Sequence, residues 1–305
     1  MNLLKERLIP FVNKLPYVRG LVKRLAYYNS VLFFPPEHYY SPVICKEEVK
    51  ENEEWIWKGQ VNPVVEGVSL HLKEQEDLLE NFKKYVSEFD FPEHSTNPVV
   101  FRLDNPFFSY HDAFILYSFI RHFSPSQIIE IGSGFSSALM MEVNERFFKD
   151  SINLHFIEPF PEERLDAFVK NRISVKTYKE KIQQIDLSLF KQLKSNDILF
   201  VDSSHVSKTG SDLNFILFNI LPILEPGVII HFHDVFYPFE YPKEWVYLGR
   251  SWNEAYILRA FLTSNENYRI LYFNDAMTSL FPDKTKDISA LSKSRGSSLW
   301  IQKMK

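Results

Sequence analysis

The stretch that most constrains this chain is residues 127–137, QIIEIGSGFSS. Isoleucines surround Glu130 in a short apolar run, and Gly132 and Gly134 follow at once. This pattern is typical of a buried parallel strand that ends in a tight turn and leads into a helix, expected over about 136–147. Because glycine has no Cβ, the backbone of such a turn comes close to a bound ligand. The sequence therefore predicts a nucleotide-type loop at the carboxyl end of a first strand.

Two carboxylates narrow the choice of ligand. The dinucleotide fingerprint G-x-G-x-x-G needs a third glycine, where this chain has Ser137. Glu130 stands two residues before the first glycine, a position suited to a cationic or amine-bearing ligand. Glu158 ends the next expected strand, 153–157, and suits both hydroxyls of a ribose. Ser136 and Ser137 are expected to cap the helix, whose first amides are free, so the spacing fits an adenosyl ligand.

Strand and helix patterns alternate from here to the end of the chain. This alternation predicts an α/β fold with a doubly wound sheet of seven strands and helices on both faces. A helix over 109–122 leads directly into the first strand, so Asn105, Tyr110 and His111 are expected near the ligand. The remaining strands are expected at 173–178, 197–202, 228–234, 268–273 and 298–302, and helices at 161–170, 186–193, 212–221 and 252–263.

Residues 1–95 are interpreted as an N-terminal arm and helical extension, and 96–305 as the main domain. The extension is irregular over 31–68 and has an amphipathic helix pattern over 70–89. Residues 1–30 hold six Lys or Arg residues against one Glu, with apolar residues at helical spacing. Two interpretations stay open: the arm packs on its own domain or on a second subunit, or it contacts a membrane surface.

Composition limits the partners and the compartment. The net charge of −4 gives no reason to expect nucleic acid as the main partner. Cys45 is the single cysteine, which excludes an intramolecular disulfide and fits a reducing, cytoplasmic compartment. No signal-peptide core is expected, and no apolar run approaches the roughly 20 residues of a spanning helix.

Chemistry in such a sheet is expected where the strands end. The fourth strand delivers Asp202 and His205, and the fifth delivers His233 and Asp234. Burying two neighbouring ionisable groups is costly without partners, which favours a functional role for the second pair. The structural alternatives are a helix cap for Asp202 and a surface position for His205. His231 shares the face of His233 but lies deeper, so it is expected in the core.

The glycine loop together with Glu158 resembles motifs I and II of class I S-adenosylmethionine-dependent methyltransferases. In that family the seventh strand is inserted antiparallel beside the sixth. The resemblance implies S-adenosylmethionine as cofactor, with Gln183 reading the adenine edge. The cofactor-binding residues that it implies are Glu130, Gly132, Ser133, Gly134, Ser136, Glu158, Gln183 and Asp202.

Asp202 and the His233–Asp234 pair fall where metal-dependent O-methyltransferases of the catechol and macrolide-sugar type place their ligands. This chain departs from those enzymes in having a histidine first in the pair. The resemblance implies a divalent cation on Asp202, His233 and Asp234, Mg²⁺ for carboxylates alone and Mn²⁺, Fe²⁺ or Zn²⁺ with an imidazole. His205 then acts as general base or supports the ligands. In the alternative, Asp234 orients His233 as the base and no metal is needed.

Residues 200–212, 231–242 and 252–256 look like a bacterial subgroup of this superfamily, close to the cephalosporin-hydroxylase-like and sugar O-methyltransferases. The resemblance covers roughly residues 100–305 and implies O-methylation of a small-molecule or saccharide hydroxyl. The long aromatic segment 236–250, with Asn253 and Glu254, is a candidate acceptor wall, and packing is the rival interpretation.

Two other function classes stay open at this point. A nicotinamide-dependent Rossmann oxidoreductase shares the glycines and Glu158, but it requires a third glycine and has no need of Glu130. A non-catalytic adenosyl-binding protein has no need of acids and histidines gathered at one edge of the sheet.

Overall fold

The structure is a computed structural model, and it describes the chain except for residues 1–15, 59–61, 98–99, 162–164, 166–168 and 170–171. It divides into two compact units. The first unit comprises residues 1–56 and 244–251, and the second comprises 57–243 and 252–305. The second unit therefore begins well before residue 96, because helix α5 (Leu72–Phe82) buries Leu79 and Phe82 in its core.

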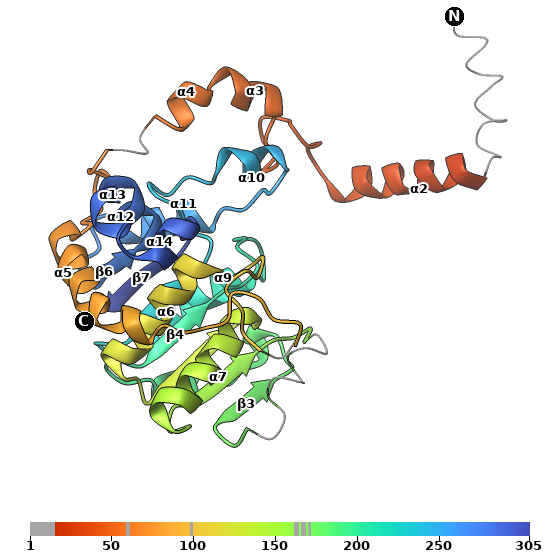
Figure 1. The fold of residues 1–305 in the computed structure, drawn as a ribbon. Helices are drawn as coiled ribbons and strands as arrows, with labels where there is room; N and C mark the ends of the chain where they lie inside the picture. The colour runs from red at the N-terminus through yellow and green to blue at the C-terminus, as the bar shows by residue number, and fades with distance from the viewer. Residues whose placement is uncertain (1–15, 59–61, 98–99, 162–164, 166–168, 170–171) are drawn as a thin grey trace, which may run out of the picture. The chain divides into compact units, whose positions relative to one another are not determined.

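The second unit is built on a seven-stranded sheet in the order β3-β2-β1-β4-β5-β7-β6 (Figure 1). The pairs from β3 to β5 are parallel, and β7 is antiparallel to both β5 and β6. This confirms the predicted α/β sheet and the antiparallel seventh strand. The strands are β1 Gln127–Ile131, β2 Asn153–Ile157, β3 Val175–Tyr178, β4 Ile198–Val201, β5 Ile229–Phe232, β6 Tyr268–Phe273 and β7 Leu299–Lys303.

Helices surround this sheet, and their apolar side chains fill the core. Helices α6 and α7 lie side by side over one face (Figure 1). Phe119 of α6 stacks on Trp300 of β7 with ring centroids 3.9 Å apart, which joins the helix to the sheet. Many other aromatic rings are buried in this core as well. The helices are α6 Tyr110–Phe123, α7 Phe135–Phe148, α9 Asp212–Phe215, α11 Glu254–Leu262, α12 Asn274–Leu280, α13 Pro282–Thr285 and α14 Ser289–Lys293.

Several local predictions were wrong in type or length. The stretch 186–193 contains a 3₁₀ turn, Phe190–Gln192, and α9 passes into a π turn, Ile216–Ile220. The helix expected over 70–89 ends as α5 at Phe82 and continues as a 3₁₀ helix, Lys83–Glu88. Most of the helix expected over 161–170 lies outside the described residues.

The described part of the first unit is mainly helical. It contains α2 (Pro16–Val31), α3 (Lys46–Glu51) and α4 (Glu53–Ile56), so the expectation of irregular structure throughout 31–68 was wrong. Within this unit the Tyr247 hydroxyl donates to Glu53 over 2.6 Å, and the Arg250 guanidinium lies 3.8 Å from the Trp245 ring centroid. Among the helices that the structure describes, none has the length and apolar character needed to cross a bilayer.

Candidate active site

The glycine turn follows β1 and packs against the backbone at the end of β4. Gly132 has a φ of +81°, and a Cβ at this position would lie 1.8 Å from the carbonyl oxygen of Asp202. Only glycine, which has no Cβ, allows the two backbones to come this close. Gly134 is the N-cap of α7, and its amide donates to the Ser137 hydroxyl over 3.0 Å. Ser137 therefore caps the helix from its third position, as a capping-box residue does.

Glu130 lies beneath this loop. Its side chain is fully buried, and its carboxyl oxygens accept hydrogen bonds from Ser136, over 2.5 Å, and from Ser137. Burial raises the pKa of Glu130 to about 8, against the lowering effect of the two hydroxyls. The oxygens of Glu130 thus hold the first turn of α7, and Glu130 lines neither of the two cavities described below. Ser136 also lines one of the cavities described below, but its hydroxyl donates to Glu130.

A cavity of about 470 Å³ opens at the carboxyl ends of β1, β2 and β4. Glu158 stands at its wall, and its carboxylate accepts from the amides of Ser133 (3.3 Å) and Phe160 (2.8 Å), which fixes its direction. Gln183 donates from Nε2 to the carbonyl of Gly210 over 2.9 Å. The predicted cofactor residues that line this cavity are Gly132, Glu158, Gln183 and Asp202, and residues not predicted include Phe160, Lys181, Ser203, Ser204, Lys208 and Asp212.

A second cavity, of about 260 Å³, is lined by the acids and histidines of the strand ends. Asp202 lines both cavities. The second one gathers the predicted catalytic side chains, as the strand-end argument required. Its lining is Phe107, Phe108, Ser133, Gly134, Phe135, Ser136, Asp202, His205, His233 and Asp234.

His205 is held from behind by a buried carboxylate. Its Nδ1 lies 2.7 Å from Glu254 Oε2, while its Nε2 lies 3.4 Å from Asp202 Oδ1 and 3.7 Å from Asp234 Oδ2. Burial lowers the pKa of His205, but the hydrogen bonds to Asp202 and Glu254 outweigh it and raise that pKa to about 10. His205 and Asp234 also have positive φ values, 59° and 58°. Such strain in non-glycine residues is concentrated at functional sites.

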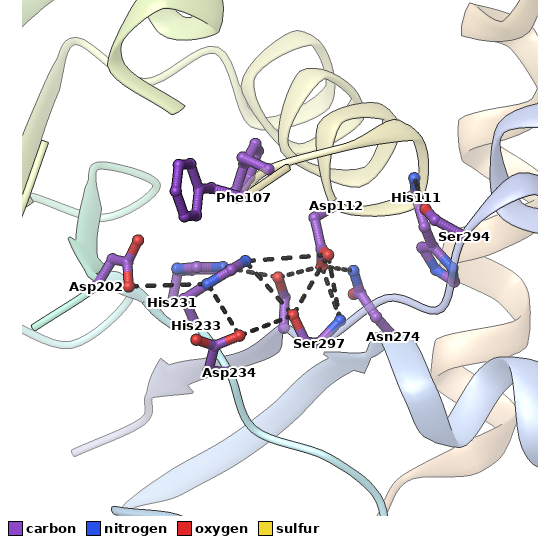
Figure 2. Close-up of polar contacts among 12 residues, drawn as sticks. Phe107, His111, Asp112, Asp202, His231, His233, Asp234, Asn274, Ser294 and Ser297 are labelled. Carbon is purple, nitrogen blue, oxygen red and sulfur yellow. Dashed lines mark hydrogen bonds and ion pairs between the residues drawn. The ribbon is translucent and has the colours of Figure 1, made fainter. Parts of the chain in front are cut away.

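His233 is similarly fixed on both sides (Figure 2). Its Nδ1 lies 3.7 Å from Asp202 Oδ1 and 3.5 Å from Asp234 Oδ1. Its Nε2 lies 3.9 Å from Asp112 Oδ2 and 3.5 Å from Ser297 Oγ. Burial works to lower the pKa of His233, and the surrounding carboxylates outweigh it, so the net direction is upward.

Asp112, at the start of α6, was missed from the sequence. Its carboxylate accepts from Asn274 Nδ2 over 2.8 Å, from the Ser297 amide over 3.0 Å and from Ser298 Oγ over 2.5 Å. Figure 2 shows Asp112 at the centre of this set, behind His233. The available signal was an acid placed next to His111 in the first turn of an otherwise apolar helix.

His231 is a core residue, as expected. Its ring stacks on Phe200 with centroids 3.7 Å apart, and Nε2 lies 2.9 Å from Ser298 Oγ. Burial holds its pKa well below the usual range, so it stays neutral.

Three residues expected near the ligand line neither cavity. Asn105 donates to the carbonyls of Arg102 and Phe108 and so closes a turn. The ring of His111 is fully buried, and the Tyr110 hydroxyl donates to Glu93 over 2.8 Å. The neighbouring Phe107 and Phe108 border the second cavity instead.

The aromatic segment does not form the expected acceptor wall within the second unit. Phe236, Tyr237, Phe239 and Tyr241 are buried, so packing is their role. Buried aromatic rings contribute strongly to the stability of the folded protein. Asn253 accepts from the Ser207 amide over 2.6 Å, and Glu254 supports His205, so both belong to the scaffold of the site.

One ligand atom from each of Asp202, His233 and Asp234 lies within 4.8 Å of the other two. Two carboxylates and an imidazole at this spacing are a donor set that suits a divalent cation such as Mn²⁺, Fe²⁺ or Zn²⁺. These three side chains are therefore a possible site for the predicted cation.

Comparisons with known proteins identify a family for part of the chain. Residues 129–235 match a family described as a methyltransferase domain. An uncharacterized protein of Archaeoglobus fulgidus is 36% identical over 182 residues, which cover 58% of this chain and 82% of that protein.

Two solved structures show a broader likeness. A methyltransferase of Podospora anserina bound to S-adenosylhomocysteine aligns with a TM-score of 0.42 and 16% identity, over 85% of this chain and 97% of that one. A putative caffeoyl-CoA O-methyltransferase of Staphylococcus aureus aligns with a TM-score of 0.38 and 15% identity, over 74% and 92%. At such TM-scores neither likeness bears on activity. The chain thus contains a domain of the methyltransferase family over residues 129–235, and its strand order is that of the class I methyltransferase fold.

Proposed function

We propose that the protein transfers a methyl group from S-adenosylmethionine to a hydroxyl oxygen of a small molecule or saccharide. The observation that carries this proposal is the pair of cavities that meet at Asp202. One has the glycine turn and an oriented carboxylate suited to a ribose, and the other has histidines backed by buried acids. A nicotinamide enzyme is disfavoured because Ser137 stands where the dinucleotide fingerprint needs its third glycine.

The larger cavity is the proposed adenosyl site. Glu158 is held by two backbone amides, so its free lone pairs are available to ribose hydroxyls. Gln183, whose side chain is anchored to Gly210, is the proposed contact for the adenine edge. S-Adenosylmethionine would supply a methyl group that the positive charge of its sulfonium activates for transfer.

His205 is the proposed base that takes the proton of the acceptor hydroxyl. Glu254, at 2.7 Å, fixes the imidazole and directs Nε2 into the second cavity. The contact between His233 Nδ1 and Asp234 Oδ1 is longer, 3.5 Å, which favours His205 over His233 as the base.

A divalent cation on Asp202, His233 and Asp234 is part of the proposal. When bound, it lowers the pKa of a coordinated hydroxyl and orients that hydroxyl. Asp202 and Glu254 raise the pKa of His205 to about 10, which keeps His205 protonated at neutral pH and unable to act as a base. A cation on Asp202 would remove part of the cause of that high pKa, so a cation and a basic His205 support each other.

Titration calorimetry with S-adenosylmethionine, S-adenosylhomocysteine and NAD tests the cofactor. We expect binding of the two sulfur compounds, and a loss of at least tenfold for Glu158→Ala, which removes the ribose contact. Glu180→Ala is the control, because Glu180 is exposed and does not line the cavity. Tighter binding of NAD, or equal affinity of the wild type and Glu158→Ala, contradicts the proposal.

Electron paramagnetic resonance of added Mn²⁺ tests the cation separately from turnover. Asp202→Asn and Asp234→Asn are expected to abolish tight binding. If chelated, metal-free enzyme methylates its acceptor at the full rate, the base acts without a metal. If neither variant slows turnover, both descriptions of the catalytic edge are wrong.

A further inference from the structure

Helix α2 combines exposed apolar side chains with charges of one sign. It runs from Pro16 to Val31, and its sequence PYVRGLVKRLAYYNSV contains Arg19, Lys23 and Arg24 but no acidic residue. All three cations are exposed. The preceding residues 1–15 add three more basic residues and one acid to the sequence.

The apolar side chains of α2 share one side of the helix. Tyr17, Leu21 and Leu25 follow one another at intervals of four, and Val18 and Val22 form the adjacent row. At 3.6 residues per turn these five positions span an arc of roughly 140°. Tyr17 is 78% exposed and Leu25 62%, and Leu21 and Val22 are also exposed, whereas Val18 is half-buried. An ordered apolar face of this kind requires a covering partner.

Exposed aromatic rings continue beyond the helix. Phe33 is 93% exposed, and Tyr39 and Tyr40 are also exposed. They form a connected group, with Phe33 4.8 Å from Phe34, Phe34 5.0 Å from Tyr40 and Tyr40 5.3 Å from Tyr39 between ring centroids. Amphipathic rings of this type favour the boundary between water and lipid.

We propose that α2 lies in the interface of a membrane that contains anionic phospholipids. Its apolar face enters the boundary of the acyl chains, and Arg19, Lys23 and Arg24 reach the phosphate groups through their flexible stems. The helix is about 24 Å long at 1.5 Å per residue and carries its cations in the middle, so it lies along the surface and does not span. A second copy is the less favourable partner, since two such faces meeting by symmetry bring like charges together.

The test is sedimentation of the full-length protein with vesicles. We expect binding to vesicles of phosphatidylglycerol mixed with phosphatidylcholine, little binding to phosphatidylcholine alone, and weakening with added salt. The triple variant Arg19→Gln/Lys23→Gln/Arg24→Gln is expected to lower partitioning roughly a hundredfold. Leu21→Ser/Leu25→Ser is expected to lower it more than tenfold, since it removes the inserted apolar groups.

A matched control separates local charge from net charge. Lys58→Gln/Lys84→Gln/Lys191→Gln removes three exposed cations from the second unit and is expected to bind vesicles as the wild type does. The proposal is overturned if the wild type stays in solution with anionic vesicles, or if control and α2 variants bind equally. Sedimentation-velocity data that show a dimer lost in the Leu21→Ser/Leu25→Ser variant, without vesicle binding, assign the face to a second copy. Cofactor titration of the same variants reports on the proposed function independently.

Discussion

Glu254 and His205 lie 49 residues apart in the chain, yet Glu254 Oε2 contacts His205 Nδ1 at 2.7 Å inside the protein. The contact is made because the backbone carbonyl of His205 also accepts the amides of Asn253 and Glu254 at the start of α11. Backbone and side-chain hydrogen bonds thus hold the start of α11 against the segment that follows β4. Nε2 of His205 is left facing Asp202 and Asp234.

Glu254→Gln keeps the shape of this contact and removes its charge. Because Glu254 helps to raise the pKa of His205 to about 10, we expect that pKa to fall in the variant. NMR titration of labelled histidine measures the pKa. Glu240→Gln, which alters a contact with Tyr256 instead, is the control. An unchanged His205 titration contradicts the assignment.

Asp112→Asn tests the support behind His233. We expect roughly a 10- to 100-fold weaker Mn²⁺ affinity and a loss of about 1–3 kcal/mol of unfolding free energy, since several buried donors lose a charged acceptor. Asp275→Asn is a control of similar cost, because Asp275 is buried against Arg295 and does not contact His233. Equal weakening of Mn²⁺ binding by both variants means that Asp112 acts only on overall stability.

Gly132→Ala is expected to be far more damaging than Gly210→Ala. Both glycines have positive φ, +81° and +72°, but an added Cβ meets the Asp202 carbonyl at 1.8 Å only at Gly132. The φ penalty, about 1 kcal/mol, is common to both, and the collision is additional. Thermal unfolding and S-adenosylmethionine affinity measure the difference. If the two variants unfold at the same temperature, the close approach of β1 and β4 is wrong.

Glu130 gives the fold a defined pH dependence. Its pKa is about 8 in the folded protein and near 4.5 when unfolded, so the folded state binds the extra proton between these values. The stabilisation is complete below about pH 4.5, declines as pH rises and is lost above about pH 8, a change of several kcal/mol. Urea unfolding of Glu130→Gln is expected to show a flatter profile over this window. A wild-type profile with no decline between pH 5 and 8 contradicts the assignment.

The sequence alone determined the sheet and the positions of its strand ends. Short apolar runs predicted the central strands β1, β4 and β5, because parallel strands are buried on both faces and must be apolar. Residues rich in β-branched side chains predicted β3 at the edge of the sheet. Once the strands were placed, the rule that their carboxyl ends meet at one edge brought together Gly132, Glu158, Asp202 and His233. The cavities bear out that inference.

Tertiary structure alone decided which side chains face the cavities and which support them. Asn274 and Ser297 meet Asp112 across separations of 162 and 185 residues, and no local pattern encodes such contacts. The sequence predicts that Glu130 contacts the cofactor. In the structure its buried carboxyl accepts hydrogen bonds from Ser136 and Ser137 in the first turn of α7. The sequence offers Tyr237 and Tyr241 as part of a candidate wall for the methyl acceptor, but both rings are buried by packing. The physical reason is that burial and hydrogen-bond satisfaction depend on every element around a residue, whereas strand and helix patterns depend mainly on its neighbours in the chain.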